Sequence, residues 1–208
     1  MVLRRPDREF LQWVEAYQRK ALREGKQPAA KDMDLTALDL SGLDLGSLSF
    51  DRSAFDGARL QGADCGGAFL VYCSVRGADF TDASLAKGLT YDSDFSGCAF
   101  LRARLIKFEA HRCDFRDADF SGADTRRMLL AGCDLRGARF RDLELADAAL
   151  MSCTLTGADF TGSRGTLAEY PINVGSDEEP RWIEGDEALQ WLRAAGAAEI
   201  GWLPRVRR

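Results

Sequence analysis

Residues 115–140 read FRDADFSGADTRRMLLAGCDLRGARF, and large apolar residues recur at every fifth position of this stretch except at Thr125. They are Phe115, Phe120, Leu130, Leu135 and Phe140. An amphipathic helix would show a period of 3.6 residues and a half-buried strand a period of 2. The stretch therefore predicts neither of these elements, but a unit of five residues that is repeated along the chain.

The repeat extends far beyond this stretch. Of the 26 positions from 35 to 160 whose number is a multiple of five, 21 are Leu or Phe. A small residue usually stands two places before each centre, and Gly is frequent two places after it, where a turn with positive φ favours it. A small residue that points inward, a polar residue that points outward and a large residue that points inward make a three-residue extended stretch. The next two residues then turn a corner. We expect the units to form a coil with the large and the small residues inside.

Five pieces carry the pattern most clearly: ARLQGADC, RGADFTDASL, RDADFSGAD, CDLRGARF and TGADF. In these pieces the chain resembles the A(D/N)Lxx units of the pentapeptide-repeat family, and the resemblance covers residues 33–162. It implies an all-β fold, a right-handed quadrilateral parallel β-helix with four units per coil. The 26 units would then make about 6.5 coils.

Four units per coil require a period of twenty, which the sequence tests independently. Eight of the nine Phe residues at the fivefold positions fall on two adjacent sides of a twenty-residue cycle. Cys73, Cys113, Cys133 and Cys153 share one column. A period of five alone would scatter these features, so we interpret twenty residues as one coil. We also expect the Phe108 ring to fill the space left by the small Gly88 one coil earlier, since protein interiors are close packed.

The ends of the chain depart from the repeat, and an open coil needs caps. Residues 7–24 carry apolar residues at helical spacing behind a possible N-cap, Asp7, so residues 1–32 are expected to form an N-terminal helical cap. Residues 163–208 are expected to form an appendage. It would be irregular over 163–184 and helical over 186–195, with Gly196 as the helix stop.

Composition argues against several classes of function. A pI near 5.1 and a net charge of −5 make direct nucleic-acid binding an unexpected role. No signal peptide and no apolar run of membrane-spanning length are visible, which favours a cytoplasmic protein without a membrane partner. The six cysteines form no CxxC pair and there is a single histidine, so we expect no metal and no cofactor.

Neither the histidine nor the cysteines predict catalysis. His111 has no serine or cysteine nucleophile placed near it, so we interpret it as an exposed bystander. A rod also offers no obvious pocket, so we expect no enzyme and no small-molecule substrate. Stacked cysteines could form disulfides or hold a soft metal. Because Cys occupies positions where Ala usually stands, we interpret the column as inward-facing filler.

One side of the coil lacks the acidic residue before the centre. Contiguous exposed apolar area usually marks an interface, so we interpret this side as a docking face for a protein partner or for a second copy of the chain. The alternative is that the Trp-rich C-terminal segment folds back and covers it. Seven apolar side chains are expected to point outward there: Phe69, Val71, Tyr72, Leu89, Tyr91, Leu129 and Met151.

Acidic residues stack in columns on the other sides. Some pentapeptide-repeat proteins are acidic, DNA-shaped rods that bind DNA gyrase or topoisomerase and protect it from poisons. The resemblance therefore implies gyrase or topoisomerase as an alternative partner. Against it, turn carboxylates often accept backbone hydrogen bonds, and residues 100–141 hold ten Lys or Arg against six acids. We therefore favour a non-enzymatic interaction or scaffold module. The acidic ladder comprises Asp79, Asp94, Asp114, Asp119, Asp134 and Asp159.

Overall fold

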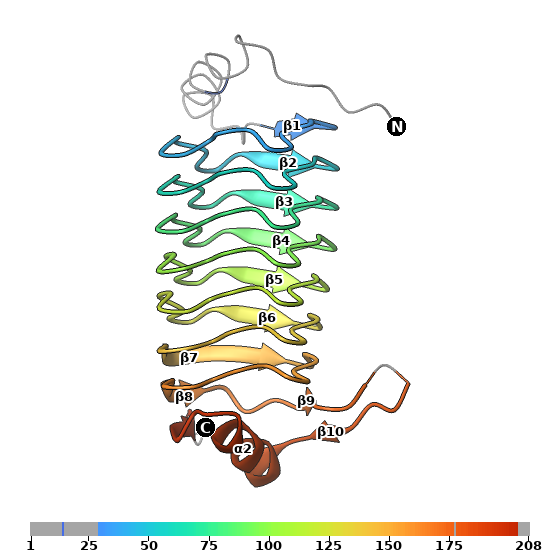
Figure 1. Cartoon of the computed structure of the whole chain (residues 1–208), viewed down its shortest axis with the longest axis vertical. Helices are drawn as coiled ribbons and strands as arrows, with labels where there is room; N and C mark the ends of the chain where they lie inside the picture. Colours follow the sequence, from blue (N-terminus) through green and yellow to red (C-terminus); the bar gives the residue numbers. More distant parts are fainter. Residues whose placement is uncertain (1–13, 15–28, 177, 204–208) are drawn as a thin grey trace, which may run out of the picture.

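The structure, a computed structural model, describes residues 14, 29–176 and 178–203. The chain forms a parallel β-solenoid of about seven turns (Figure 1). The expected helix over residues 7–24 lies outside the described residues, apart from Val14, which is helical and buried.

Short parallel strands, one per turn, build one side of the solenoid. Each pairs with a strand twenty residues further on, as in Phe69 with Leu89 and Leu89 with Glu109. Isolated bridges, also twenty residues apart, join the turns on the other sides. The coil of twenty residues is therefore confirmed. The strands of this side are β1 (Ala29–Lys31), β2 (Ser49–Asp51), β3 (Phe69–Val71), β4 (Leu89–Tyr91), β5 (Glu109–His111), β6 (Leu129–Ala131) and the longer β7 (Glu144–Met151).

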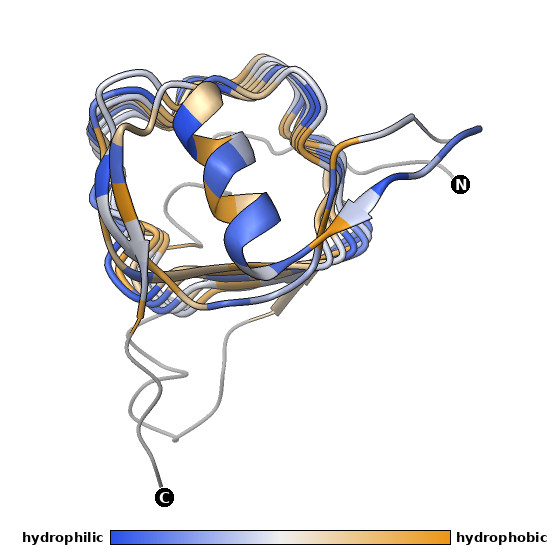
Figure 2. Cartoon of the chain, turned by 90° about the horizontal axis from the view of Figure 1, so that it is seen from below, coloured by the Kyte–Doolittle hydropathy of each residue, from blue (hydrophilic) through white to orange (hydrophobic). Residues whose placement is uncertain are grey.

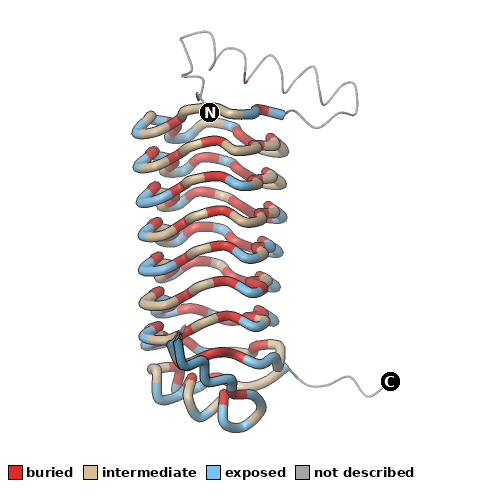
Figure 3. Tube along the Cα trace, turned by 90° about the vertical axis from the view of Figure 1, so that its right-hand side faces the viewer, coloured by how far each residue is buried: buried red, intermediate tan, exposed pale blue. Residues whose placement is uncertain are grey.

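The core is a set of stacked columns. Along the chain, inward and outward residues alternate in the way that the five-residue unit predicts (Figure 3). In one column the rings lie 4.9 to 5.1 Å apart, centroid to centroid, and within 9° of parallel. Offset or stacked rings at this spacing add to the stability from burial alone. This column comprises Phe80, Phe100, Phe120, Phe140 and Phe160.

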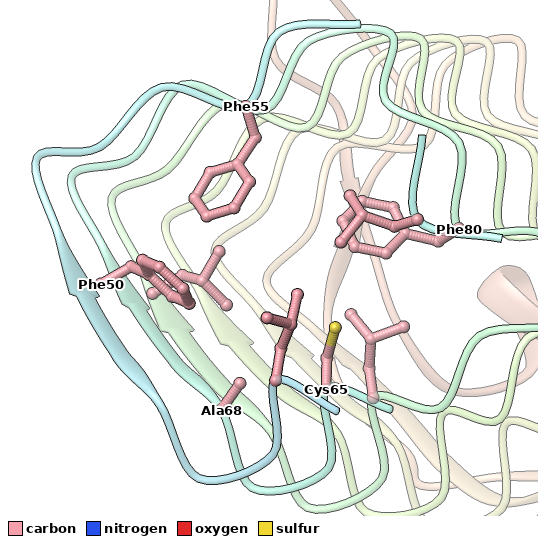
Figure 4. A pocket seen from close by; sticks show the side chains of 9 residues that line it. Phe50, Phe55, Cys65, Ala68 and Phe80 are labelled. Atoms are coloured by element: carbon pink, nitrogen blue, oxygen red, sulfur yellow. The ribbon is translucent and has the colours of Figure 1, made fainter. Parts of the chain in front are cut away.

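A small cavity of about 20 Å³ lies near the N-terminal end of this core (Figure 4). Leu60, Cys65 and Phe80 are among the side chains that line it, and all of the lining residues are apolar. Phe80 is the first ring of the stacked column, and Leu60 occupies the same place one turn earlier. The cavity therefore lies where the core changes from rings to smaller side chains.

The C-terminal segment closes the end of the solenoid. β8 (Arg164–Leu167) pairs with β7, and β11 (Glu199–Trp202) pairs with β8. β9 (Ile172–Asn173) and β10 (Trp182–Ile183) form a separate antiparallel pair. The helix α2 (Gly185–Ala194) lies across the open end of the last turn (Figure 2).

At the two ends of the solenoid the structure confirms one expectation from the sequence and differs from two others. The helix expected at 186–195 is confirmed, and Gly196 follows it with a φ of 107°. Residues 163–184, expected to be irregular, instead supply β8, β9 and β10. At the other end the strand ladder begins at Ala29, before the expected start at 33. Backbone pairing, with the neighbouring turn for β1 and β8 and between β9 and β10, accounts for both differences.

In the described parts of the chain, no helix combines the length and apolar character needed to cross a membrane.

Candidate protein-interaction surface

The seven apolar residues expected on one side lie on that side, and we call them the apolar strip: Phe69, Val71, Tyr72, Leu89, Tyr91, Leu129 and Met151. The parallel register places Phe69, Leu89 and Leu129 in one column and Val71, Tyr91 and Met151 in the next. Each three-residue strand turns its middle residue into the core, so the flanking residues must point outward. Tyr72 is 59% exposed, and the other six are half-buried.

The centre of the strip is a cluster of aromatic rings. Tyr91 stacks on His111 with ring centroids 4.7 Å apart, and it meets Phe69 edge to face at 6.0 Å. The guanidinium carbon of Arg112 lies 5.9 Å from the centre of the Tyr91 ring, within the range of a cation–π contact. These contacts hold Phe69, Tyr91 and His111 in fixed positions relative to one another.

His111 was expected to be an exposed bystander, and the structure places it in this cluster instead. Its side chain is 24% exposed and lies 4.0 Å from Glu109. The signal in the sequence was its position twenty residues after Tyr91, which the register of the coil converts into direct contact. The residues beside it in the sequence gave no such indication.

The strip is uneven along the rod. Phe69, Leu89 and Tyr91 belong to consecutive turns, whereas Leu129 and Met151 lie beyond Glu109 and His111. Ala131 separates Met151 from His111 in the same column. The structure therefore brings together the part of the strip formed by β3 and β4, and leaves Leu129 and Met151 as a smaller extension.

The C-terminal segment does not cover the strip with any of its described residues. The backbone N–H of Phe160 donates to the Ala195 carbonyl at 2.8 Å, and β11 continues the ladder beyond β8. The indole N–H of Trp202 donates to the Gly185 carbonyl at 3.2 Å, which ties the final strand to α2. These contacts keep the described residues of the segment at the end of the rod (Figure 1), so the interpretation that the segment folds back over the strip is wrong for residues 163–176 and 178–203.

The six aspartates of the acidic ladder lie in two columns, one of which is interrupted by Ala99 and Arg139, and their carboxylates are engaged. Each of its six aspartates accepts a hydrogen bond from the backbone N–H two residues further on, at 2.9 to 3.1 Å. This arrangement is an Asx-turn, which stabilises the corner of the coil. The carboxylates therefore have a structural role at the corners.

Arginines also lie between the carboxylates of the ladder. Arg116 pairs with Asp114 at 2.5 Å and approaches Asp134 at 3.7 Å. Partial burial acts to raise the pKa of Asp114, but the hydrogen bonds from Arg116 outweigh it and hold this pKa below the usual range. At the last turn, hydrogen bonds from Thr161, assisted by Arg141, lower the pKa of Asp159 to about 2. The ladder is consequently a mixed-charge surface rather than a uniformly acidic one.

The cysteine column faces the core. All six cysteines are buried, and burial raises the pKa of Cys73 to about 11 and that of Cys65 to about 12. A thiol with such a pKa is neutral near pH 7 and is a poor nucleophile and metal ligand. Over residues 29–176 and 178–203, no group of three or more His, Cys, Asp or Glu is placed to hold a metal ion.

The comparisons with known proteins agree with this architecture. A family model described as pentapeptide repeats matches in eight copies over residues 58–87, 92–127 and 128–164. No curated protein sequence matches the chain significantly.

Solved structures show the same type of solenoid. A trypsin-treated variant of QnrB1, a plasmid-mediated fluoroquinolone resistance protein, superposes with a TM-score of 0.55 and 21% identity, covering 68% of this chain and 71% of that one. Full-length QnrB1 gives a TM-score of 0.53 and 22% identity, over 67% of this chain and 77% of that one. HetL, a pentapeptide-repeat protein from the cyanobacterium Nostoc, gives 0.22 and 20%, over 71% and 91%. At these identities the likeness to QnrB1 shows a shared fold alone, and the score for HetL is too low to carry an argument.

Proposed function

The chain belongs to the pentapeptide-repeat family, and from this premise we propose that it is a non-enzymatic interaction module that binds a protein partner through the apolar strip. The observation that carries the proposal is the aromatic cluster of Phe69, Tyr91 and His111 on the outer side of the rod. Aromatic side chains are over-represented among the residues that dominate binding energy. A rigid solenoid that holds them in fixed positions suits a docking role.

The occupant of the strip is either a second copy of the chain or another protein. Light scattering of the wild type distinguishes these cases, because a second copy doubles the mass in solution. The test variant is Phe69→Asp with Leu89→Asp, which places two charges in the strip. The matched control is Leu101→Asp with Ile106→Asp, which changes two half-buried apolar residues outside the strip. Circular dichroism establishes that both variants are folded.

The expected result is that the strip variant loses a defined association that the wild type and the control retain. For a homodimer this is a fall to monomer mass. For a different partner it is the loss of specific proteins from quantitative pull-downs from the source cells. If the folded strip variant keeps the mass and the captured proteins of the wild type, the proposal is wrong.

A second candidate is a DNA-mimicking modulator of DNA gyrase or topoisomerase. The observation in its favour is the column of three adjacent carboxylates, Asp94, Asp114 and Asp134, on consecutive turns. Arg116 and Arg136 lie within ion-pair distance of this column, which lowers the negative potential that a DNA mimic needs. A supercoiling assay tests this candidate function. If micromolar protein changes the activity of DNA gyrase neither with nor without a fluoroquinolone, the candidate is excluded.

A further inference from the structure

Three cationic side chains stand one above another along one corner of the solenoid: Lys87, Lys107 and Arg127. They are twenty residues apart, and each occupies the same turn position with a φ of 57° to 59°. All three are exposed. We call this column the cationic ridge.

The ridge is unusual in having no acidic partner. Most other arginines of the rod pair with a carboxylate, either one turn earlier, as Arg102 does with Asp82, or two residues earlier, as Arg116 does with Asp114. Within the described residues, no ion pair involves a member of the ridge.

The two ends of this column do not neutralise the ridge. Gly67 holds the turn position one coil before Lys87, and Asp147 holds it one coil after Arg127. The carboxylate of Asp147 accepts a hydrogen bond from the Thr166 hydroxyl at 3.3 Å and forms no ion pair with Arg127. Like charges stacked directly on neighbouring strands repel one another. An anionic ligand would offset this repulsion.

The ridge forms one border of the apolar strip. A single inward residue separates Lys87 from Leu89, and likewise Arg127 from Leu129. On the opposite border the charges are neutralised, because Arg112 donates two hydrogen bonds to Asp92 at 2.6 and 2.8 Å. The docking face is therefore apolar at Leu89 and Leu129, with the exposed carboxylate of Glu109 between them, cationic along one edge and neutral along the other.

We propose that the strip and the ridge together bind an amphipathic α-helix of a partner protein that carries apolar residues on one face and Asp or Glu along the adjoining edge. This inference rests on the proposed function and names the chemistry of its partner. The charged edge would lie on the ridge, and the apolar face on Phe69, Leu89 and Tyr91. The helix would run along the rod.

The spacing of the turns favours a helix over an extended segment. Neighbouring turns are about 4.8 Å apart, whereas one helical turn rises about 5.4 Å and a two-residue step of a strand about 6.7 Å. Over the two steps from Lys87 to Arg127 a helix drifts out of register by roughly 1.2 Å, and a strand by roughly 3.8 Å. Flexible Lys and Arg side chains absorb the first mismatch more readily than the second.

The test selects ligands without assuming a partner. The probe is a phage-displayed library of peptides of about 18 residues, five helical turns, with apolar positions at helical spacing and random residues elsewhere. Peptides enriched on the wild type are synthesised, and their affinities are measured by fluorescence polarisation.

Four forms of the protein are compared: the wild type, the ridge variant, the strip variant defined above (Phe69→Asp with Leu89→Asp), and a control. The ridge variant carries Lys87→Gln, Lys107→Gln and Arg127→Gln. The control carries Arg59→Gln, Arg76→Gln and Arg102→Gln, which removes the same charge from arginines paired elsewhere on the rod. Vesicles of equimolar phosphatidylcholine and phosphatidylserine test a lipid surface in place of a peptide.

The expected result is enrichment of peptides with an acidic edge. Their affinity should fall roughly tenfold in the ridge variant and in the strip variant, but not in the control. Raising the salt concentration should weaken binding to the wild type more than binding to the ridge variant. Circular dichroism of peptide titrated with protein should show a gain of helix.

Other outcomes overturn the inference in distinguishable ways. Peptides that lose affinity for the strip variant but bind the ridge variant as tightly as the wild type leave the proposed function standing and refute the acidic edge. Bound peptides that remain extended refute the helix. Binding of vesicles without binding of peptides assigns the face to anionic lipid. If no peptide is enriched, the inference is wrong, and the proposed function is decided by the mass and pull-down measurements described above. If enriched peptides bind the strip variant as tightly as the wild type, the inference is wrong as well, because the helix does not lie on the strip.

Discussion

The ring of Phe108 lies against Gly88 of the preceding turn, with its Cδ2 atom 3.3 Å from the point that a Cβ on Gly88 would occupy. Phe108 holds a position where most five-residue units carry a small residue, and it is fully buried. The missing side chain in one turn thus provides the volume for the large one in the next. Close packing is maintained between turns rather than within each turn.

Gly88→Ala is expected to destabilise the protein by about 1 to 3 kcal/mol, because the added methyl group meets both the Phe108 ring and the Leu85 carbonyl oxygen at 2.9 Å. Urea denaturation followed by circular dichroism measures the change. Gly201→Ala is the control, since its Cβ would meet nothing within 4 Å. Equal stabilities of the two variants would contradict the packing argument.

The small cavity near the N-terminal end predicts that two substitutions of Cys65 change the stability of the protein in opposite directions. Cys65→Val adds apolar volume beside the cavity and is expected to stabilise the protein by up to about 1 kcal/mol, whereas Cys65→Ala enlarges the cavity and should destabilise it. Thermal unfolding of both variants measures the two shifts.

A control for this prediction lies elsewhere in the core. Cys98 is buried, is not among the residues lining the cavity, and donates its S–H to the Val75 carbonyl at 2.8 Å. Cys98→Val should therefore destabilise the protein. Stabilisation by Val at both positions would show that the cavity is not the cause.

The coil was predictable from the sequence, and its closure was not. The five-residue period determines which side chains point into the core and which point outward. The buried residues of the coil and the seven outward residues of the strip could therefore be predicted from it. β8 and β11 are four-residue strands that pair although Arg164 and Glu199 are far apart in the sequence, and no period marks them. His111 was missed because its environment comes from Tyr91 one turn away.

Asp159 predicts a dependence of stability on pH. Hydrogen bonds from the Thr161 hydroxyl and N–H, and from Arg141, lower its pKa from 3.8 to about 2. A folded-state pKa below the unfolded value means that this group stabilises the fold above about pH 4, and that the contribution is lost as the pH falls toward 2.

The substitution Asp159→Asn tests this, because the amide keeps an acceptor oxygen but does not titrate. The difference in free energy of unfolding between the wild type and the variant should shrink as the pH falls from 4 to 2, as measured by urea denaturation at several pH values. If the difference in free energy of unfolding between the wild type and Asp159→Asn stays constant from pH 4 to pH 2, the carboxyl of Asp159 does not cause the pH dependence.

The buried thiols predict slow chemical labelling. Under native conditions all six cysteines should react with a disulfide reagent at least about a thousandfold more slowly than in urea, because the thiols become accessible only on unfolding. Tyr72→Cys, at an exposed position, should add one rapidly reacting thiol and so calibrates the assay. A rapidly reacting thiol in the wild type would show that the cysteine column has a role beyond filling the core.

The constant register of twenty residues has a consequence for how such a protein can change over time. Duplication or loss of one coil alters the length of the rod by a fixed step and leaves every remaining side chain on its original face. A substitution at an outward position alters a face and leaves the length unchanged. Length and surface chemistry can therefore be inherited as independent traits, and the reach of the docking face can vary among descendants without any change in what the face recognises.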